Sequence, residues 1–156
     1  DGFAALSGSR QRVTFEGQAA MEFEMILDDA DDGPPYPFPC ADGVIEIAPA
    51  VRAAADDVRS GVPAGGISAR FHRGLVRLFA GVCRQVAAER GISTVALSGG
   101  VFQNLWLLRH LGDELQAAGL RVLIHRLVPC NDGGIALGQL AVAAERHLTG
   151  WEEPCV

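Results

Sequence analysis

The chain has 156 residues, a net charge of −6 and 49% hydrophobic residues. This length suits one domain with its own core, and the apolar content excludes disordered, collagen-like and coiled-coil chains. The acidic balance argues against a general nucleic-acid-binding protein, and no apolar run approaches the ~20 residues of a membrane span. The four cysteines are scattered singly, without a CxxC pair, which indicates free thiols in a reducing, cytoplasmic setting.

The first half of the chain is predicted to be mainly helical. Apolar residues at helical spacing predict helices over residues 16–27, 49–59 and 66–90, with a short strand at 44–47. His72 lies beside the apolar stripe of the longest helix. A single histidine in such a place is expected to be a hydrogen-bonded structural residue rather than a ligand.

An acidic segment separates the first of these helices from the strand. Residues 28–35 combine four aspartates with a glycine and two prolines. Charge repulsion and helix-breaking residues predict a solvated loop that continues to Cys40. A metal-binding loop or a nucleic-acid mimic is the alternative, but the segment lacks the calcium-loop spacing and its terminal glutamate.

The second half is predicted to be a strand–helix–strand–helix unit. The strands are expected at residues 93–97 and 121–125, and the helices at 101–118 and 135–148. Short connections with this alternation imply parallel strands joined by right-handed crossovers. Ligands bind at the carboxyl ends of the strands in such sheets.

A glycine-rich loop follows each strand, Ser98-Gly99-Gly100 after the first and Asn131-Asp132-Gly133-Gly134 after the second. Glycines remove the Cβ atoms that would block an anion, and a following helix offers free N–H groups, so such loops can hold a phosphate. Neither loop matches the P-loop or the dinucleotide-binding motif. By itself, the first loop is therefore more typical of a tight β–α turn.

Two polar side chains near these loops are candidate ligand contacts. Asp132 can cap the helix that follows it, or it can direct its carboxylate to a metal or a sugar hydroxyl. Asn104, one turn into the first of the two helices, offers both a donor and an acceptor. Because the carboxyl ends of neighbouring parallel strands meet at one edge, we expect both loops to line one pocket.

A serine hydrolase is the rival interpretation. Residues 96–100 (ALSGG) are close to the nucleophile elbow GxSxG, with alanine at the first position. Asp132 and His147 follow Ser98 in the order of a catalytic triad. However, His147 falls late in an amphipathic helix, and the chain is short for a complete hydrolase sheet.

Four motifs resemble one known family. Residues 97–104 (LSGGVFQN) and 131–139 (NDGGIALGQ) resemble the HypF family of hydrogenase-maturation carbamoyltransferases. Residues 14–21 (TFEGQAAM) and 69–72 (ARFH) are similar to the same C-terminal region of that family, in matching order. The related antibiotic O-carbamoyltransferases share parts of this pattern.

The resemblance implies an α/β fold. Residues 1–148 would form the second lobe of an actin-like, ribonuclease H-like (ASKHA) domain, with residues 149–156 as a C-terminal tail. The sheet would be mixed, with a parallel β-α-β-α C-terminal unit. The sequence begins at Asp1 with what resembles the end of a longer helix, so we expect a fragment of a larger multidomain protein.

The resemblance also implies a reaction. The family makes carbamoyl-adenylate from carbamoyl phosphate and ATP. It then passes the carbamoyl group to the C-terminal cysteine thiol of a HypE-like partner, for the cyanide ligands of [NiFe] hydrogenase. The fragment is expected to contact the remaining domains of its own polypeptide and to be inactive alone. Where its apolar surface is exposed, it is expected to form a homodimer. The third class left open is a non-catalytic, sugar-kinase-like nucleotide binder.

The resemblance also implies roles for individual residues, according to their positions in the matching motifs. Gly99, Gly100 and Asn104, with the adjoining Ser98, match the loop and helix start that hold the adenylate, and Glu16 and Gly17 match a glycine turn that touches the nucleotide. Asp132 matches a ligand of a divalent metal (iron, zinc or magnesium).

Two departures from the family pattern stand out. The HxxxH motif that supplies the other metal ligands is absent here, so the metal site would be completed by histidines outside this chain. Cys130 stands where the family commonly has proline; it is either a neutral replacement or an additional metal ligand.

Overall fold

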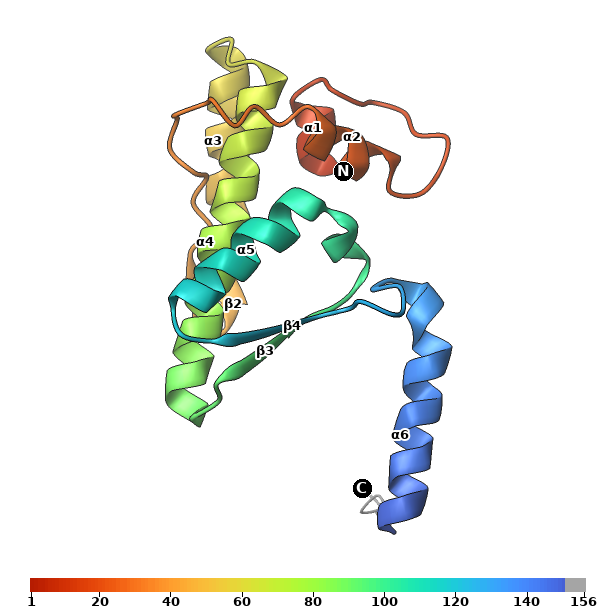
Figure 1. Cartoon of the computed structure of the whole chain (residues 1–156). Helices are drawn as coiled ribbons and strands as arrows, with labels where there is room; N and C mark the ends of the chain where they lie inside the picture. Colours follow the sequence, from red (N-terminus) through yellow and green to blue (C-terminus); the bar gives the residue numbers. More distant parts are fainter. Residues whose placement is uncertain (151–156) are drawn as a thin grey trace.

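The N-terminal part of the chain is helical, as its apolar spacing predicts. The computed structural model describes residues 1–150, so most of the expected tail lies outside the described residues. The elements of this part are α1 (Gly2–Leu6), α2 (Gln18–Met25), the hairpin strands β1 (Cys40–Ala41) and β2 (Val44–Ile45), α3 (Ala48–Arg59) and α4 (Ala64–Arg90) (Figure 1).

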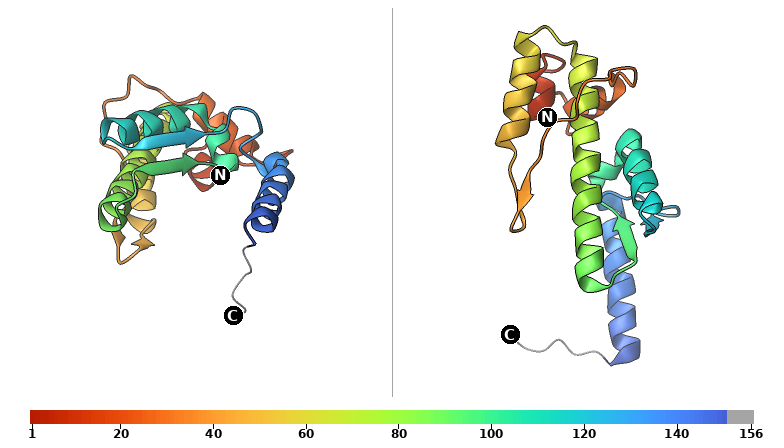
Figure 2. Two further views of the ribbon diagram at one scale, coloured as in Figure 1. Left: turned by 60° about the horizontal axis from the view of Figure 1, so that its bottom comes forward. Right: turned by 90° about the vertical axis from the view of Figure 1, so that its left-hand side faces the viewer.

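The long helix α4 runs along the molecule and joins its two halves (Figure 2). Its first turns pack against α1, α2 and α3, around a buried cluster that includes Phe23 and Ile67. Its later turns pack against α5 (Leu105–Ala117) through Val76 and Ala80. The helix ends where Gly91 takes φ 64°, a left-handed conformation that glycine adopts without strain. Each half of the chain therefore has its own apolar cluster on one shared helix.

The acidic segment 28–39 is not the solvated loop that its composition predicts. It crosses α4 as a strap, and Tyr36 is buried with only 4% of its surface exposed. Asp31 is also largely covered, and the indole Nε1 of Trp106 donates to Asp29 Oδ1 at 2.7 Å. The prediction is wrong for Asp31 and Tyr36, because Arg70 and Arg73 from far along the chain pair with Asp31 and hold the segment on α4. Asp28, Asp29 and Asp32 are exposed, as the composition predicts.

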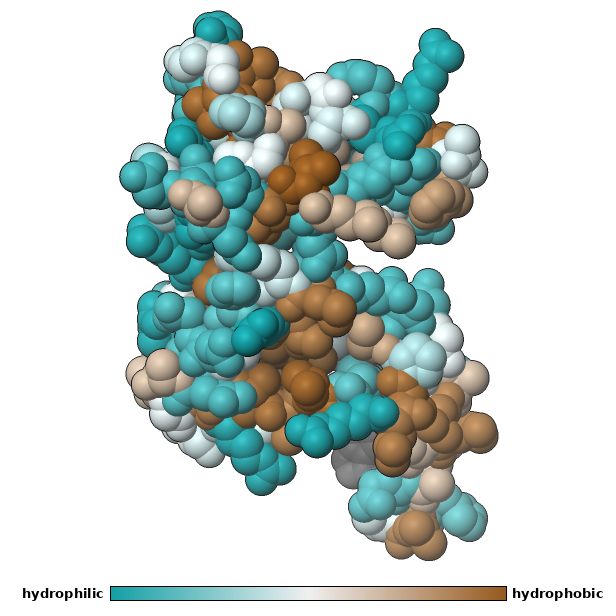
Figure 3. Space-filling view, turned by 45° about the horizontal axis from the view of Figure 1, so that its top comes forward, coloured by the Kyte–Doolittle hydropathy of each residue, from teal (hydrophilic) through white to brown (hydrophobic). Residues whose placement is uncertain are grey.

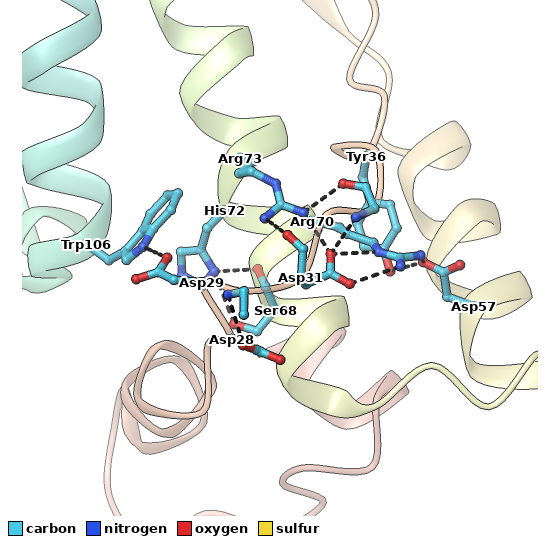
Figure 4. Close-up of polar contacts among 12 residues, drawn as sticks. Asp28, Asp29, Asp31, Tyr36, Asp57, Ser68, Arg70, His72, Arg73 and Trp106 are labelled. Atoms are coloured by element: carbon cyan, nitrogen blue, oxygen red, sulfur yellow. Dashed lines mark hydrogen bonds and ion pairs between the residues drawn. The ribbon is translucent and has the colours of Figure 1, made fainter.

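An ion-pair network fixes this strap (Figure 4). Arg70 lies between two carboxylates, 3.0 Å from Asp31 and 2.9 Å from Asp57, and Arg73 also reaches Asp31 at 2.8 Å. The Tyr36 hydroxyl donates to Asp57 Oδ2 at 2.7 Å. The hydrogen bond from Arg70 outweighs partial burial and holds the pKa of Asp31 below its usual range. The strap is therefore anchored by charge-assisted hydrogen bonds as well as by apolar packing.

The C-terminal half contains the predicted parallel unit. The strands β3 (Thr94–Leu97) and β4 (Arg121–Ile124) pair in parallel, with Leu97 opposite Ile124. They pack against α4 and α5 around a second cluster that includes Leu107, Leu111 and Leu115. The α/β class is confirmed, but β1–β2 and β3–β4 are two separate two-stranded sheets in the described residues rather than one mixed sheet.

The helix predicted over residues 101–118 is interrupted. A 3-10 turn, η1 (Gly100–Gln103), comes first, and α5 begins only after Asn104. Asn104 has extended backbone angles, φ −70° and ψ 103°, and its side chain accepts a hydrogen bond from the N–H of Leu107 at 2.7 Å. This N-cap bond satisfies one of the free donors at the helix start and explains where α5 begins.

The last elements are the turn η2 (Asp132–Gly134) and α6 (Ile135–Thr149), which stands apart from the rest of the chain (Figure 1). None of its residues is buried by the described part of the protein. Apolar side chains gather on the surface at this end of the molecule (Figure 3), and those of α6 are Ile135, Leu137, Leu140, Val142 and Leu148. None of the helices within residues 1–150 has the length and apolarity to cross a membrane.

Candidate functional site

One cavity brings together three of the four matched motifs, from both halves of the chain. It measures about 290 Å³ and lies between the start of α2, the middle of α4 and the junction of η1 with α5. Glu16 and Gly17 line one side, and Gly100 and Asn104 line the other. Figure 3 shows the hollow between the N-terminal helices and the part of the molecule below them. Four of the predicted nucleotide contacts therefore share one pocket.

The glycines of this site leave open space. Gly17, the N-cap of α2, has φ 80°, and Gly99 has φ 106°, so both adopt conformations that other residues rarely take. None of the atoms of residues 1–150 lies within 4 Å of the place where a Cβ would stand at either position, apart from the glycine and its chain neighbours. Gly100 has an ordinary φ, and its nearest such neighbour is Asn131 at 3.9 Å. The backbone is thus accessible to a ligand at these turns.

A buried hydrogen-bond chain forms one wall of the pocket. Nε2 of His72 lies 2.8 Å from Nδ2 of Asn104, and Nδ1 of His72 lies 2.8 Å from the carbonyl oxygen of Ser68. The Ser68 hydroxyl in turn donates to the carbonyl of Phe23 (Figure 4 labels Ser68 and His72). The chain links α2, α4 and α5, and it supports the prediction that His72 is a hydrogen-bonded residue.

The surroundings of His72 favour its neutral form. Only 2% of its surface is exposed, and burial lowers the pKa of the imidazole. The hydrogen bond to Ser68 and the charge of Glu24 act in the opposite direction but more weakly. Rings of Phe23 and Trp106 lie 5.8 Å and 5.7 Å from the imidazole, between centroids.

Ser98 does not line this cavity. Its hydroxyl lies 2.8 Å from Nε2 of His125, at the exposed carboxyl ends of β3 and β4. His125 is not among the site residues predicted from the sequence. The sequence does contain a signal for this contact, because Ser98 and His125 lie at the carboxyl ends of the two predicted strands. Leu97 pairs with Ile124 in the parallel register, so the next residues, Ser98 and His125, lie side by side.

The two glycine loops are in contact, but they do not line one pocket as predicted, because none of residues 131–134 lines the cavity. The N–H of Gly99 donates to the carbonyl oxygen of Cys130 at 2.8 Å. Asn131 caps η2 by accepting from the N–H of Gly133 at 3.1 Å, and Asp132 is exposed as the first residue of that turn. Cys130 is a free, half-buried thiol whose backbone, rather than its sulfur, makes the contact between the loops.

Asp132 does not form a metal centre with the residues around it. Among residues 1–150, no group of three or more His, Cys, Asp or Glu side chains could hold a metal ion. His72 and His125 are engaged as described, and Nδ1 of His110 lies 2.8 Å from the carbonyl oxygen of Trp106. One carboxylate is a suitable hard donor, but it is an incomplete ligand set for any of the metals considered.

The triad of the hydrolase interpretation is not formed. Asp132 precedes α6 and His147 lies in its last turn, so a helix rise of about 1.5 Å per residue places them roughly 18 Å apart. The histidine that contacts Ser98 is His125 instead. In the described part of the chain, no carboxylate is hydrogen-bonded to the other ring nitrogen of His125.

The chain is similar to known proteins over most of its length. The family model described as "Carbamoyltransferase, Kae1-like Domain, second subdomain" matches residues 1–139. The protein named carbamoyltransferase HypF from Rhizobium leguminosarum bv. viciae is 38% identical over 146 residues, which are 93% of this chain and 19% of that protein. The protein of the same name from Rhodobacter capsulatus is 35% identical over 143 residues, or 92% of this chain and 18% of that one.

Solved structures give the same result. A crystal structure titled full-length HypF in the phosphate- and nucleotide-bound form matches with a TM-score of 0.85 and 40% identity, over 92% of this chain and 19% of that one. The structure of T. kodakarensis HypF matches with a TM-score of 0.80 and 26% identity, over 95% and 20% of the two chains. The chain therefore spans about a fifth of the length of these relatives.

Proposed function

The chain belongs to the family of second subdomains of Kae1-like carbamoyltransferase domains, and we propose that it forms one side of the nucleotide site in a HypF-type carbamoyltransferase. The proposed reaction is transfer of a carbamoyl group from carbamoyl-adenylate, made from carbamoyl phosphate and ATP, to a thiol. Because the chain spans about a fifth of its relatives, the activity is proposed for the longer polypeptide and not for this part alone.

The observation that carries this proposal is the shared cavity. Glu16 and Gly17 are more than eighty residues from Gly100 and Asn104 in the sequence, yet all four line the same space of about 290 Å³. A cavity of this size is close to the lower end of small-molecule sites, which span about 300–1,000 Å³. Of the two structures described above, the one with the higher TM-score is titled as a phosphate- and nucleotide-bound form, which supports a nucleotide as the ligand here.

The pocket is suited to hold and orient an adenylate. Gly17 and Gly100 line the cavity without side chains, so phosphate or ribose can approach the backbone closely there. In the transfer step, an incoming thiolate attacks the carbamoyl carbon, a sulfur–carbon bond forms, and the bond from carbon to the adenylate phosphate oxygen breaks to release AMP. The contribution of this chain to that step is to fix the leaving adenylate relative to the thiolate.

The acceptor and the metal complete the proposal. We propose the C-terminal cysteine of a HypE-like hydrogenase-maturation protein as the acceptor, and the route to a cyanide ligand as its purpose. Asp132 would supply one oxygen ligand to a divalent metal, with histidines from outside this chain supplying the others. We assign the metal no step, since the donor set within residues 1–150 is incomplete.

The exposed surface of α6 is the proposed contact with the rest of the polypeptide. Its apolar side chains have no partner among the described residues, and a helix that buries nothing gains no stability from packing. We propose that other domains of the same polypeptide cover this surface in the full-length protein. A homodimer through α6 is the alternative, and sedimentation of the full-length protein distinguishes the two.

The test is nucleotide binding by the full-length protein. Gly100→Val adds a side chain to the pocket wall without backbone strain, because Gly100 has an ordinary φ. We expect the Kd for ADP, measured by calorimetry, to rise at least tenfold, or about 1.4 kcal/mol. Gly81→Ala is the control, since Gly81 lies in α4 outside the pocket and none of the described atoms beyond its own helix turn lies within 4 Å of its Cβ position. Equal ADP affinity in both variants would overturn the assignment.

The contact between Ser98 and His125 keeps one alternative testable. A hydroxyl 2.8 Å from an imidazole nitrogen has the geometry of a serine–histidine pair. A hydrolase predicts that a fluorophosphonate labels Ser98 covalently and that His125→Ala abolishes labelling. The carbamoyltransferase proposal predicts no labelling.

A further inference from the structure

We propose that His72 is a positioning residue for the nucleotide pocket: its neutral ring holds the side-chain amide of Asn104 in the pocket wall, and protonation of the ring releases that amide. The inference rests on the proposed function, because it specifies how the same site is controlled. It assigns to a buried residue of α4 an effect on ligand affinity that acts through Asn104.

The hydrogen-bond chain determines the tautomer of His72 and the orientation of the Asn104 side-chain amide. The Ser68 carbonyl can only accept, so Nδ1 of His72 carries the proton in this 2.8 Å contact. Nε2 therefore has a free lone pair in the neutral ring, and it accepts from Nδ2 of Asn104 at 2.8 Å. The oxygen of the same amide accepts from the N–H of Leu107 at 2.7 Å. Both ends of the Asn104 amide are thus fixed, one by α4 and one by the start of α5.

Protonation of His72 breaks this arrangement. The imidazolium has two N–H donors and no acceptor, so its Nε2–H would face the N–H donors of Asn104. Asn104 cannot resolve the conflict by rotating its amide, because its oxygen would then leave the N-cap of α5. The side chain, which lines the cavity, must move away from His72. The shape of the pocket wall is therefore coupled to one proton on His72.

The surroundings determine when this proton is taken up. Glu24, from α2, is the charged group that acts on the ring, whereas α5 contributes the neutral side chains of Asn104 and Trp106. Burial outweighs the attraction of Glu24 and lowers the pKa of His72, so the neutral, positioning form predominates at neutral pH. Nucleotide affinity should be constant there and should fall as the pH drops below 6.5, the ordinary pKa of histidine.

A purely structural role predicts something different. His72 also fills space among the rings of Phe23, Phe71 and Trp106. If that were its whole role, a side chain of similar size would preserve nucleotide affinity at every pH, and the pH profile would belong to other groups. The direction of the pH dependence therefore separates positioning from packing.

The experiment is calorimetric titration of the full-length protein with ADP from about pH 5 to 8, the range in which histidines titrate. In the wild type, we expect affinity to fall about tenfold toward the acid end, the equivalent of about one hydrogen bond. His72→Gln can accept from Asn104 without titrating, so its profile should be flat. His110→Gln, on α5 outside the pocket, should keep the wild-type profile.

Asn104→Asp provides the sharpest variant. Aspartate caps a helix about as well as asparagine, so α5 keeps its start. A carboxylate at this position can pair with protonated His72 but repels the lone pair of the neutral ring. The pH dependence should therefore reverse, with ADP bound more tightly at the acid end. This variant keeps the inference testable even where His72→Gln does not fold.

The outcomes distinguish a failure of this inference from a failure of the proposed function. A wild-type profile in His72→Gln, or an unreversed profile in Asn104→Asp, would overturn the inference and leave the proposed function intact. An ADP affinity in the wild type that does not vary with pH would do the same. Failure of the wild type to bind ADP at any pH would overturn the proposed function, and the inference with it.

Discussion

The half of the molecule around α3 is closed by the strap and its ion pairs, whereas the half around β3 and β4 leaves one side open. In the first half, the strap 28–39 covers α4, and Arg70 neutralises two carboxylates at once. In the second half, the parallel strands pack against α4 and α5, while Leu123 and Ile124 remain exposed and α6 buries no residue. Parallel sheets are normally covered on both faces.

This difference indicates that the two halves of the chain have different structural roles around the pocket. The N-terminal half is stabilised by contacts within residues 1–90, so it can serve as a fixed wall for the pocket. The C-terminal half presents an apolar surface that the described residues 1–150 leave uncovered. The pocket lies at the junction of the two, between α2 and η1, where both can influence it.

The largest expected contrast is between two leucines in the second half. Leu111 in α5 is 2% exposed, and Leu140 in α6 is 68% exposed. Leu111→Ala should lower the free energy of unfolding of the chain by about 3 kcal/mol, because it leaves a cavity. Leu140→Ala should change it by less than about 0.5 kcal/mol. Urea unfolding measures both, and an equal loss would show that α6 is packed within this chain.

The second contrast concerns ion pairs in the first half. Arg70→Ala leaves the largely covered carboxylates of Asp31 and Asp57 without their shared partner. We expect a loss of about 2 kcal/mol in the free energy of unfolding. Arg59→Ala removes an exposed pair with Asp56 and should cost less than about 0.5 kcal/mol. Similar losses from both variants would contradict the anchored strap.

The third contrast is between two glycines of α4. A Cβ at Gly74 would lie 2.5 Å from the carbonyl oxygen of Tyr36 in the strap, whereas none of the described atoms lies within 4 Å of one at Gly81. Gly74→Ala should destabilise the chain by about 1.5 kcal/mol, because the strap must shift. Gly81→Ala should stabilise it by up to about 1 kcal/mol, as expected for alanine in a helix. Thermal unfolding of the pair tests whether the strap is in contact with α4.

The helices and glycine loops could be predicted from sequence because their signals are local. The apolar stripe of α4 predicts that helix to within two residues of its observed start. The strap could not be predicted, because Asp31 and Arg70 are 39 residues apart and follow no periodicity. Within the site, the glycines were found by motif. The roles of His72 and His125 depend on which elements meet, which a single sequence does not show.

The smallest expected effect is on the free energy of unfolding at acid pH, compared between the wild type and Asp31→Asn. The pKa of Asp31 is lowered in the folded protein, so its contribution to stability is fully present above the ordinary carboxyl range and is lost as the pH falls through the lowered value. The free energy of unfolding should therefore decrease with falling pH, and less steeply in Asp31→Asn. Urea unfolding at a series of acid pH values checks the slope. An unchanged slope in the variant would assign the acid sensitivity to other groups.

The most direct test of the central claim is photolabelling of the full-length protein with an azido-adenine nucleotide. If both halves of the chain line one nucleotide pocket, labelled peptides will include residues near Glu16 and Gly17 as well as residues of η1, and unlabelled ADP will suppress both. Labelling of neither segment, or labelling confined to the separate cavity lined by Leu97, Ile124 and His125, would contradict the account.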